Sequence, residues 1–355
     1  MDCLLLWKYS DLKLQYEKMC FIVDENHFEL KNNVYNMYIR PKMSKFDLNI
    51  EQKTPIFIDF LKRVICDNNE QVFKWLINYM AKMFQVGKTK QLLVLQGKMG
   101  AGKSTFCELL SFIISEYYTQ TLNDIHQLDA RFNALAQKTI LTIIEEVVSD
   151  AGDFHKINSK LKSLTTEYRI LIEKKGVDQF MDYSNNNQII NSNGQNPLHI
   201  TKDNRRNMII YVKNHEQKNY DYFSRLRKEV NENIEFIRYY LYTYKFTDDL
   251  NSIRPITDAE ICMLDLNKSS VEMFAEEALI LTGDKTNWER KSSHIYELYK
   301  VYCSKNRLKV TQSKYFKGEL EPIIGVPFFR NASGVYIQGF LNEDKLNFLD
   351  EDYDI

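Results

Sequence analysis

The chain has 355 residues, of which 44% are hydrophobic and 27% are charged, and its net charge is −1. These are the values of an ordinary globular protein, and the length is enough for about two or three domains. They exclude a disordered chain, a collagen-like chain and a small disulfide scaffold. The apolar runs fall short of the roughly 18–20 residues that span a bilayer, and the N-terminus has no basic segment. Neither a membrane anchor nor a signal peptide is therefore expected.

The six cysteines are widely spaced singletons, without a CxxC pair or a Cys/His cluster in the sequence. A zinc site is therefore not expected, and reduced thiols in an intracellular, reducing compartment are the simplest interpretation. Charge is unevenly distributed. Residues 285–317 hold nine Lys or Arg against two Glu, which indicates a basic domain. The last fifteen residues hold six acids and one Lys, which indicates an acidic tail.

The first 88 residues combine weak strand signals with a clear helical pattern. Short strand-like pieces occur at 21–23 and 34–39. Between 55 and 85 apolar residues recur at helical spacing, interrupted at 67–69. This spacing predicts two helices that form a hairpin.

Four apolar strands are predicted next, at 92–96, 139–144, 188–190 and 208–212. Helical stretches lie between several of them. Alternating strands and helices predict an α/β fold with a mainly parallel sheet that is covered on both faces.

The last part of the chain is predicted to be mainly helical. A single helix is expected over 221–244, and the basic segment is expected to form helices at 294–305 and 311–320. Thr311 or Ser313 is the expected N-cap of the last helix, and a strand–turn–strand follows over 328–337. Helix, helix and β-hairpin is the outline of a winged-helix domain.

The most specific signal is GKMGAGKS at 97–104, which matches GxxxxGK[ST] between a predicted strand and a predicted helix at 104–114. In such a loop backbone N–H groups and a helix N-terminus bind phosphates. Lys103 is expected to reach the β- and γ-phosphates of ATP, and Ser104 to ligate Mg²⁺. The nucleotide-binding residues expected are Gly97, Lys98, Met99, Gly100, Ala101, Gly102, Lys103, Ser104 and Thr105.

Two acids follow the second predicted strand. Glu145 and Glu146 end an apolar strand, which places both carboxylates at the carboxyl edge of the sheet, near the phosphate loop. One would hold Mg²⁺, and the other would orient and deprotonate the attacking water. We assign Glu145 to the metal and Glu146 to the water, with exchanged roles as the alternative.

Polar residues beside the next two strands extend this site. Asn193, or alternatively Asn191, is expected to bridge the γ-phosphate and the attacking water. Arg205 and Arg206 precede the last strand of the sheet. One of these guanidinium groups is expected to reach the γ-phosphate that a neighbouring subunit holds.

A basic hairpin is predicted between the second and third strands. Residues 156–175 hold six Lys or Arg against two Glu, and the predicted turn contains Lys174-Lys175-Gly176. A basic tip suits a phosphate backbone, and Phe180 or Tyr183 would stack on bases. The DNA-binding residues expected are Lys162, Lys174 and Lys175.

The order of these motifs resembles the superfamily 3 helicase core, an AAA+-type P-loop ATPase. The resemblance is strongest to the helicase part of primase-helicases of the poxvirus, phage and plasmid type. It implies a homohexameric ring that hydrolyses ATP with Mg²⁺ between subunits, uses an arginine finger in trans and translocates on single-stranded and forked duplex DNA. The sequences that carry it are GKMGAGKST (97–105), Phe132-Asn133, TIIEE (142–146), LKSLTTEYRILIEKKG (161–176), QIINSN (188–193) and DNRR (203–206).

The resemblance also suggests a domain plan. We expect a mixed segment (1–53), a helical collar that assists oligomerisation (54–88), the ATPase core (89–215), a helical segment (216–282), a winged-helix-like basic domain (283–341) and the acidic tail (342–355). Primase catalytic acids are not evident, so a primase or polymerase is expected as a partner. Two alternatives stay open. One is a DNA-binding AAA+ ATPase for loading, packaging or regulation without unwinding, and the other is a phosphate-loop enzyme such as a kinase.

Overall fold

The computed structural model describes residues 18–23, 34–46, 49–123, 127, 137–145, 154–174, 177–278, 289–325 and 327–338. The chain divides into two compact units, one ending at Leu264 and the other beginning at Asp265. Each unit has its own hydrophobic core. The predicted acidic tail (342–355) lies outside the described residues.

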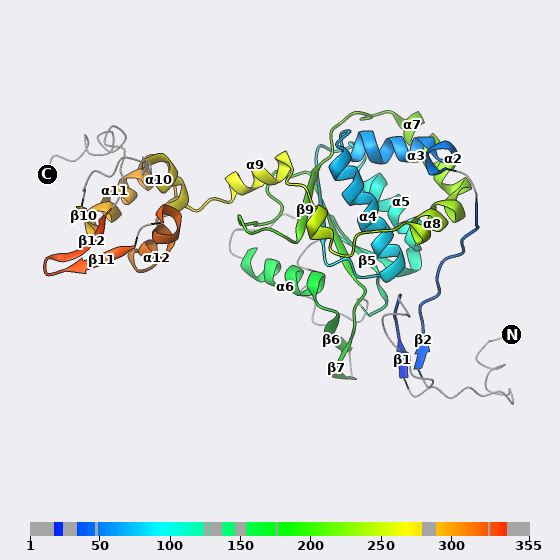
Figure 1. Cartoon of the computed structure of the whole chain (residues 1–355), viewed down its shortest axis with the longest axis horizontal. Helices are drawn as coiled ribbons and strands as arrows, with labels where there is room; N and C mark the ends of the chain where they lie inside the picture. The colour runs from blue at the N-terminus through cyan, green and yellow to red at the C-terminus, as the bar shows by residue number, and fades with distance from the viewer. Residues whose placement is uncertain are drawn as a thin grey trace. The chain divides into compact units, whose positions relative to one another are not determined.

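The first unit is built around a five-stranded parallel sheet (Figure 1). Its strand order is β4–β5–β8–β3–β9, and every neighbouring pair is parallel. This confirms the predicted α/β fold with a parallel sheet. The strands are β3 Leu92–Gln96, β4 Thr119–Leu122, β5 Leu141–Glu145, β8 Asn187–Ser192 and β9 Asn207–Tyr211.

Helices cover both faces of this sheet (Figure 1). Leu93 and Leu95 of β3 belong to one apolar cluster, whereas Leu92 and Val94 belong to another on the opposite face. Burial on both faces explains why the strand is apolar throughout rather than alternating. The first cluster includes α4 Glu70–Val86, α5 Lys103–Ile114, α7 Tyr220–Glu232 and α8 Ile234–Thr243, and the second includes α6 Phe154–Thr166 and α9 Asp258–Leu266.

The predicted helical hairpin at 55–85 is confirmed. Its first arm is α3 Pro55–Asp59 continued by the π-helical turn η1 Phe60–Ile65, and its second arm is α4. Asp67 and Asn68 have positive φ angles of 50° and 59° in the turn, a conformation that these two residue types tolerate. The Asn69 side chain then caps α4 by accepting from two backbone N–H groups of its first turn.

Two predictions in the first unit are wrong. The expected single helix at 221–244 breaks at Asn233, whose backbone is not helical and whose side chain donates to Glu229 O (2.8 Å). Such side-chain bonds compete with helix continuation. The expected strand at 21–23 is not formed. Those residues follow β1 Lys18–Cys20, which pairs in parallel with β2 Val34–Asn36.

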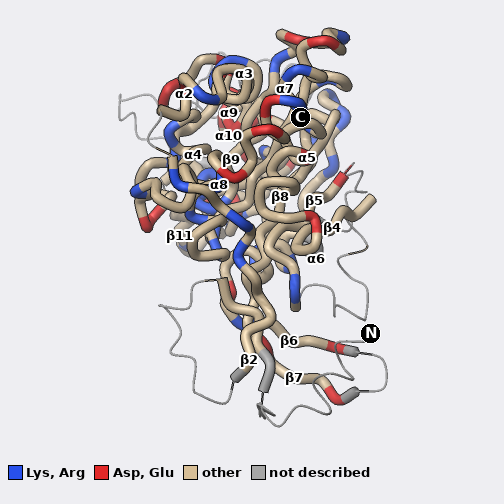
Figure 2. Tube along the Cα trace, turned by 90° about the vertical axis from the view of Figure 1, so that its right-hand side faces the viewer, with Lys and Arg blue, Asp and Glu red and all other residues tan. Residues whose placement is uncertain are grey.

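A two-stranded hairpin projects from the body of the first unit in both ribbon and tube views (Figure 1, Figure 2). It consists of β6 Arg169–Lys174 and β7 Val177–Tyr183, paired antiparallel with a register shift near the tip. The predicted hairpin is therefore confirmed, and its turn lies outside the described residues. The remaining short elements of the unit are α2 Ile50–Lys53, η2 Glu116–Tyr118 and η5 Leu250–Ile253.

In the described part of the second unit, three helices pack against a small antiparallel sheet of order β10–β12–β11. Tyr299 and Phe316 stack at its centre with ring centroids 4.7 Å apart. The prediction that Thr311 or Ser313 caps its last helix is wrong, because the helix begins at Ser313 after Gln312, whose side chain makes no capping hydrogen bond. The elements are α10 Ser270–Ala278, β10 Glu289–Lys291, α11 Ser292–Lys305, α12 Ser313–Ile324, β11 Phe328–Asn331 and β12 Gly334–Gln338.

Candidate functional site

The glycine-rich loop that is predicted to bind phosphate (97–104) connects β3 to α5 at the carboxyl edge of the sheet. Gly97 has a φ of +144°, and a Cβ placed there would lie 2.3 Å from the carbonyl oxygen of Val212. Gly102, with a φ of +112°, packs against Phe60 and Val64 of the helical hairpin. Glycine is therefore required at both positions by backbone conformation and by close packing.

Lys103 turns its ammonium group back into this loop. Its Nζ donates to Gly97 O (2.6 Å), Lys98 O (3.0 Å) and Asn193 Oδ1 (2.9 Å). Burial lowers the pKa of Lys103, and the nearby carboxylate of Glu145 opposes that change. The sequence predicted both Lys103 and Asn193 as site residues, and the structure brings them into direct contact.

Asn191 joins the loop helix to the acidic strand. Its Nδ2 donates to Ser104 Oγ (3.0 Å) and to both carboxylate oxygens of Glu145 (3.1 and 2.8 Å). This contact arises because β8 lies between β3 and β5, so that Asn191 pairs in register with Leu95 on one side and Glu145 on the other. Lys103, Ser104, Glu145, Asn191 and Asn193 therefore form one cluster, here called the loop cluster.

Several predicted site residues lie outside the described part of the chain. These are Glu146, Lys175 and the Phe132-Asn133 pair, together with the side chain of Lys174. The hairpin strands leading to that turn are described. Phe180, one of the two expected base-stacking residues, is instead half-buried against Ile170 and Ile172. The other, Tyr183, lies under the guanidinium of Arg169.

Arg205 and Arg206 lie at the opposite edge of the sheet from the loop cluster. They precede β9, whose first residue pairs with Leu92 at the start of β3, whereas the phosphate loop follows the end of β3. Five residues of extended strand span about 16 Å. Within one chain, neither arginine is therefore positioned beside the phosphate loop.

A cavity of about 140 Å³ adjoins the two arginines. Lys162 of α6 lines this cavity with Arg205 and Arg206, as does the carboxylate of Asp203. The sequence placed Lys162 among the DNA-binding residues of the hairpin. The structure groups it with the arginines instead, an association that the sequence could not reveal because it depends on how α6 packs on the sheet.

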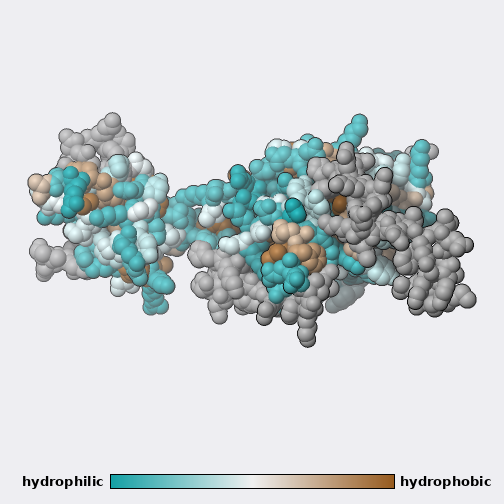
Figure 3. Space-filling model, turned by 90° about the horizontal axis from the view of Figure 1, so that it is seen from below, coloured by the Kyte–Doolittle hydropathy of each residue, from teal (hydrophilic) through white to brown (hydrophobic). Residues whose placement is uncertain are grey.

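The described surface is mainly hydrophilic. One side of the molecule carries a compact apolar patch surrounded by hydrophilic residues (Figure 3). Among the described residues, none of the helices is both long enough and apolar enough to cross a membrane.

Comparison with known proteins gives three findings. Residues 95–206 match the family model DUF5906, described as a family of unknown function. A stretch of 140 residues is 28% identical to the DNA Primase-polymerase of Nitratiruptor phage NrS-1, covering 39% of this chain and 19% of that protein. The chain thus spans about a fifth of the length of this relative.

The fold extends well beyond the matched sequence. Two apo structures of the NrS-1 C-terminal region each align with 91% of this chain, at a TM-score of 0.62. They are 18% and 17% identical to it, and 85% and 84% of their own length is covered. At this low sequence identity, the similarity shows a shared fold alone. This chain therefore has the fold of the NrS-1 C-terminal region, and its match to DUF5906 includes the glycine-rich loop as well as Arg205 and Arg206.

Proposed function

We propose that this chain is an ATP-dependent DNA helicase that acts as a homohexameric ring. The observation that carries the proposal is the loop cluster, where Lys103 and the Ser104–Asn191–Glu145 bridge lie around one glycine-rich loop. An ammonium group beside backbone N–H groups at a helix N-terminus suits a polyphosphate. This arrangement supports ATP as the nucleotide and hydrolysis as the reaction.

The loop cluster also fits Mg²⁺. The ion prefers oxygen ligands and keeps several waters, so one hydroxyl and one carboxylate are a sufficient contribution from the protein. Ser104 Oγ and Glu145 both contact the amide of Asn191, so their oxygens face one small space. When bound, the ion stabilises charge on the phosphates. We propose that Asn191 orients Ser104 and Glu145, the two protein ligands of the ion. Glu146, which follows Glu145 in the sequence, is our proposed base for the attacking water.

The arginine pair supports catalysis between subunits. Arg205 and Arg206 lie at the sheet edge opposite the loop cluster, so a phosphate within their reach belongs to another subunit. A guanidinium that approaches a transferring phosphate is worth about 10³–10⁵ in rate. A closed ring in which every subunit gives one arginine and receives one satisfies this geometry.

The similarity to the NrS-1 protein and the projecting β6–β7 hairpin both support DNA as the substrate. The NrS-1 protein is named a DNA primase-polymerase, and this chain shares the fold of its C-terminal region. We propose that Lys174 and Lys175 at the hairpin tip contact the backbone of single-stranded DNA. A primase or polymerase would be carried by a partner or by another part of a longer protein.

The second unit supports a contact with duplex DNA. We propose that its helix–helix–hairpin arrangement is a winged-helix domain. Lys314 and Tyr315 are exposed on α12, whereas Glu321 is half-buried and accepts from Phe328 N (2.8 Å). We propose that Lys309, Lys314 and Lys317 contact the phosphates of the duplex.

The proposal is tested by strand displacement on forked DNA carrying either a 3′ or a 5′ single-stranded arm. We expect unwinding by the wild type, its loss in Lys103→Ala, and its retention in the control Lys245→Ala, which removes an exposed lysine remote in sequence from the loop. DNA-dependent ATP hydrolysis without unwinding of either fork would instead support the loading or packaging alternative. Phosphoryl transfer to a small molecule would contradict both.

A further inference from the structure

A buried ion pair lies behind the segment that carries the two arginines. Arg254 and Glu260 have side chains that are only 7% and 3% exposed, and they are bonded to each other. Glu260 belongs to α9, and Arg254 precedes that helix. Neither residue belongs to the loop cluster, and neither lines the cavity beside Arg205.

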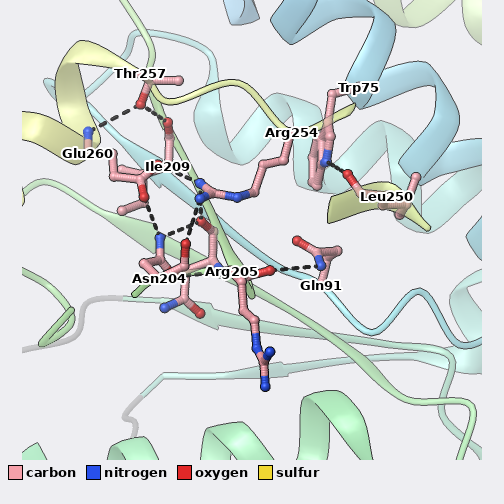
Figure 4. Close-up of polar contacts among 10 residues, drawn as sticks. Trp75, Gln91, Asn204, Arg205, Ile209, Leu250, Arg254, Thr257 and Glu260 are labelled. Atoms are coloured by element: carbon pink, nitrogen blue, oxygen red, sulfur yellow. Dashed lines mark hydrogen bonds and ion pairs between the residues drawn. The ribbon is translucent and has the colours of Figure 1, made fainter. Parts of the chain in front are cut away.

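This ion pair holds both ends of the segment Asn204–Asn207, here called the arginine segment. Arg254 donates to Asn204 O (2.7 Å) and to Asn207 O (3.2 Å). Glu260 Oε1 accepts from the side chain of Asn204 (2.7 Å), which also donates to Asn207 O (2.9 Å). Figure 4 shows these contacts converging on Asn204.

The two carbonyl groups between these ends are fixed as well. Gln91 Nε2 donates to Arg205 O (3.2 Å), and Leu92 N donates to Arg206 O (2.8 Å). All four backbone carbonyls from Asn204 to Asn207 are therefore hydrogen-bonded. The Arg205 side chain is exposed and extends away from the ion pair (Figure 4).

The start of α9 is itself anchored to the sheet. Thr257 Oγ1 donates to Ile209 O (2.6 Å) of β9 and accepts from Glu260 N (3.2 Å). Thr257 and Glu260 have the spacing of a capping box, in which the glutamate normally bonds back to the N-cap N–H. Here the Glu260 carboxylate bonds to Arg254 and Asn204 instead. The acid in the first turn of α9 therefore bonds to the arginine segment instead of to the N-terminus of its own helix.

Stability alone is a weak reason for such a pair. Removing two charges from water costs several kcal/mol per ion, and a buried pair often adds no more stability than apolar residues of the same volume. What the pair does provide is a fixed position for the backbone to which it bonds. Its planar guanidinium and its carboxylate fix the backbone at both ends of Asn204–Asn207, the segment that carries the exposed Arg205 side chain.

We propose that Arg254 and Glu260 are positioning residues for Arg205, holding its backbone so that the guanidinium meets a phosphate in a neighbouring subunit. This inference rests on the proposed ATPase function. It assigns Arg205, rather than the half-buried Arg206, as the residue presented. Displacement of a catalytic group by about 1 Å costs up to roughly 100-fold in rate.

The test compares Glu260→Gln with the double variant Arg254→Met/Glu260→Met. The double variant removes both charges and both arginine-to-carbonyl bonds and replaces them with apolar side chains, so we expect the unit to stay folded. Glu276→Gln, the same acid-to-amide change in the more exposed ion pair with Lys268, is the control. We expect kcat to fall about 10- to 100-fold in the first two proteins. We expect KM for ATP to change little, because each subunit keeps its own phosphate loop.

Mixed rings separate positioning from general damage. Lys103→Ala subunits have an intact arginine segment, so mixing them with Glu260→Gln subunits should restore hydrolysis. Mixing Glu260→Gln with Arg205→Ala should not. A loss of activity that Lys103→Ala subunits fail to relieve would overturn the inference, as would wild-type kcat in both the single and the double variant. If the proposed function itself fails, wild-type rings show no hydrolysis, or Arg205→Ala has no effect.

Discussion

At the scale of single residues, Gly97 has the least room for a side chain among the glycines that the structure describes. An added Cβ would lie 2.3 Å from Val212 O, and the residue has a φ of +144°. Gly97→Ala should therefore lower the free energy of unfolding by about 2 kcal/mol or more. Gly194 has an ordinary φ and a nearest neighbour at 3.4 Å. Gly194→Ala should change stability by less than about 0.5 kcal/mol. Urea unfolding of both variants measures this difference, and equal losses would contradict it.

Lys88 gives a prediction about pH. It is fully buried, and its Nζ donates to Asn186 O (2.7 Å) and to Leu164 O, which ties the end of α6 to the loop before β8. Burial lowers the pKa of Lys88 to about 7, against 10.5 for an ordinary lysine, with Glu167 opposing the change. Between these two values the unfolded chain binds more protons than the folded one, so stability should rise with pH.

The slope from this one group is at most about 1.4 kcal/mol per pH unit. Lys88→Met removes the titration, so its free energy of unfolding should rise less steeply than that of the wild type between pH 7 and pH 9. Urea titrations at several pH values measure both curves. Parallel curves would show that Lys88 is not held with a lowered pKa.

The sequence predicted the residues of the loop cluster but not the hydrogen bonds that join them. Lys103, Ser104 and Glu145 were predictable because a phosphate loop and an acid at a strand end are local patterns. The bridging role of Asn191 was not, because it depends on β8 lying between β3 and β5. The grouping of Lys162 with Arg205 was hidden for the same reason, since it arises from helix packing rather than from spacing.

At the scale of elements, two glycines of α12 give opposite predictions. Nothing lies within 4 Å of a Cβ added at Gly318 or at Gly325, but only Gly325, the C-cap, has a positive φ, of +70°. Gly318→Ala should raise stability by about 1 kcal/mol through helix propensity. Gly325→Ala should lower it by about 1–2 kcal/mol, because an L-residue is strained there. The melting temperatures of the two variants, each compared with that of the wild type, test this prediction. Shifts of the same sign would contradict it.

The elements that were predicted correctly are those with strong periodic or apolar signals. The strands β3 and β5 are buried and mainly apolar, β8 and β9 each contain a buried Ile-Ile pair, and the hairpin of α3 and α4 has clear helical spacing. The edge strand β4 was missed because its sequence, TQTL, is polar and only partly buried. The break at Asn233 was missed because its cause is a side-chain bond to the preceding turn.

At the scale of the whole molecule, the two units have separate cores, and chemistry is concentrated in the first. Because β3 and β9 are parallel neighbours, the loop cluster lies where β3 ends and the arginine segment lies where β9 begins. In our proposal, a subunit organised in this way supplies a phosphate site at one edge and a cation at the other. Assembly into a ring is the whole-molecule consequence that follows from our proposal.

The most direct measurement is the rate of ATP hydrolysis with and without single-stranded DNA, recorded together with oligomer mass, for the wild type, Lys103→Ala and Lys245→Ala. We predict a hexamer whose hydrolysis is stimulated by DNA, abolished in Lys103→Ala and unchanged in Lys245→Ala. A monomer that ignores DNA and hydrolyses ATP equally well after Lys103→Ala would contradict the proposal that this phosphate loop drives a DNA helicase.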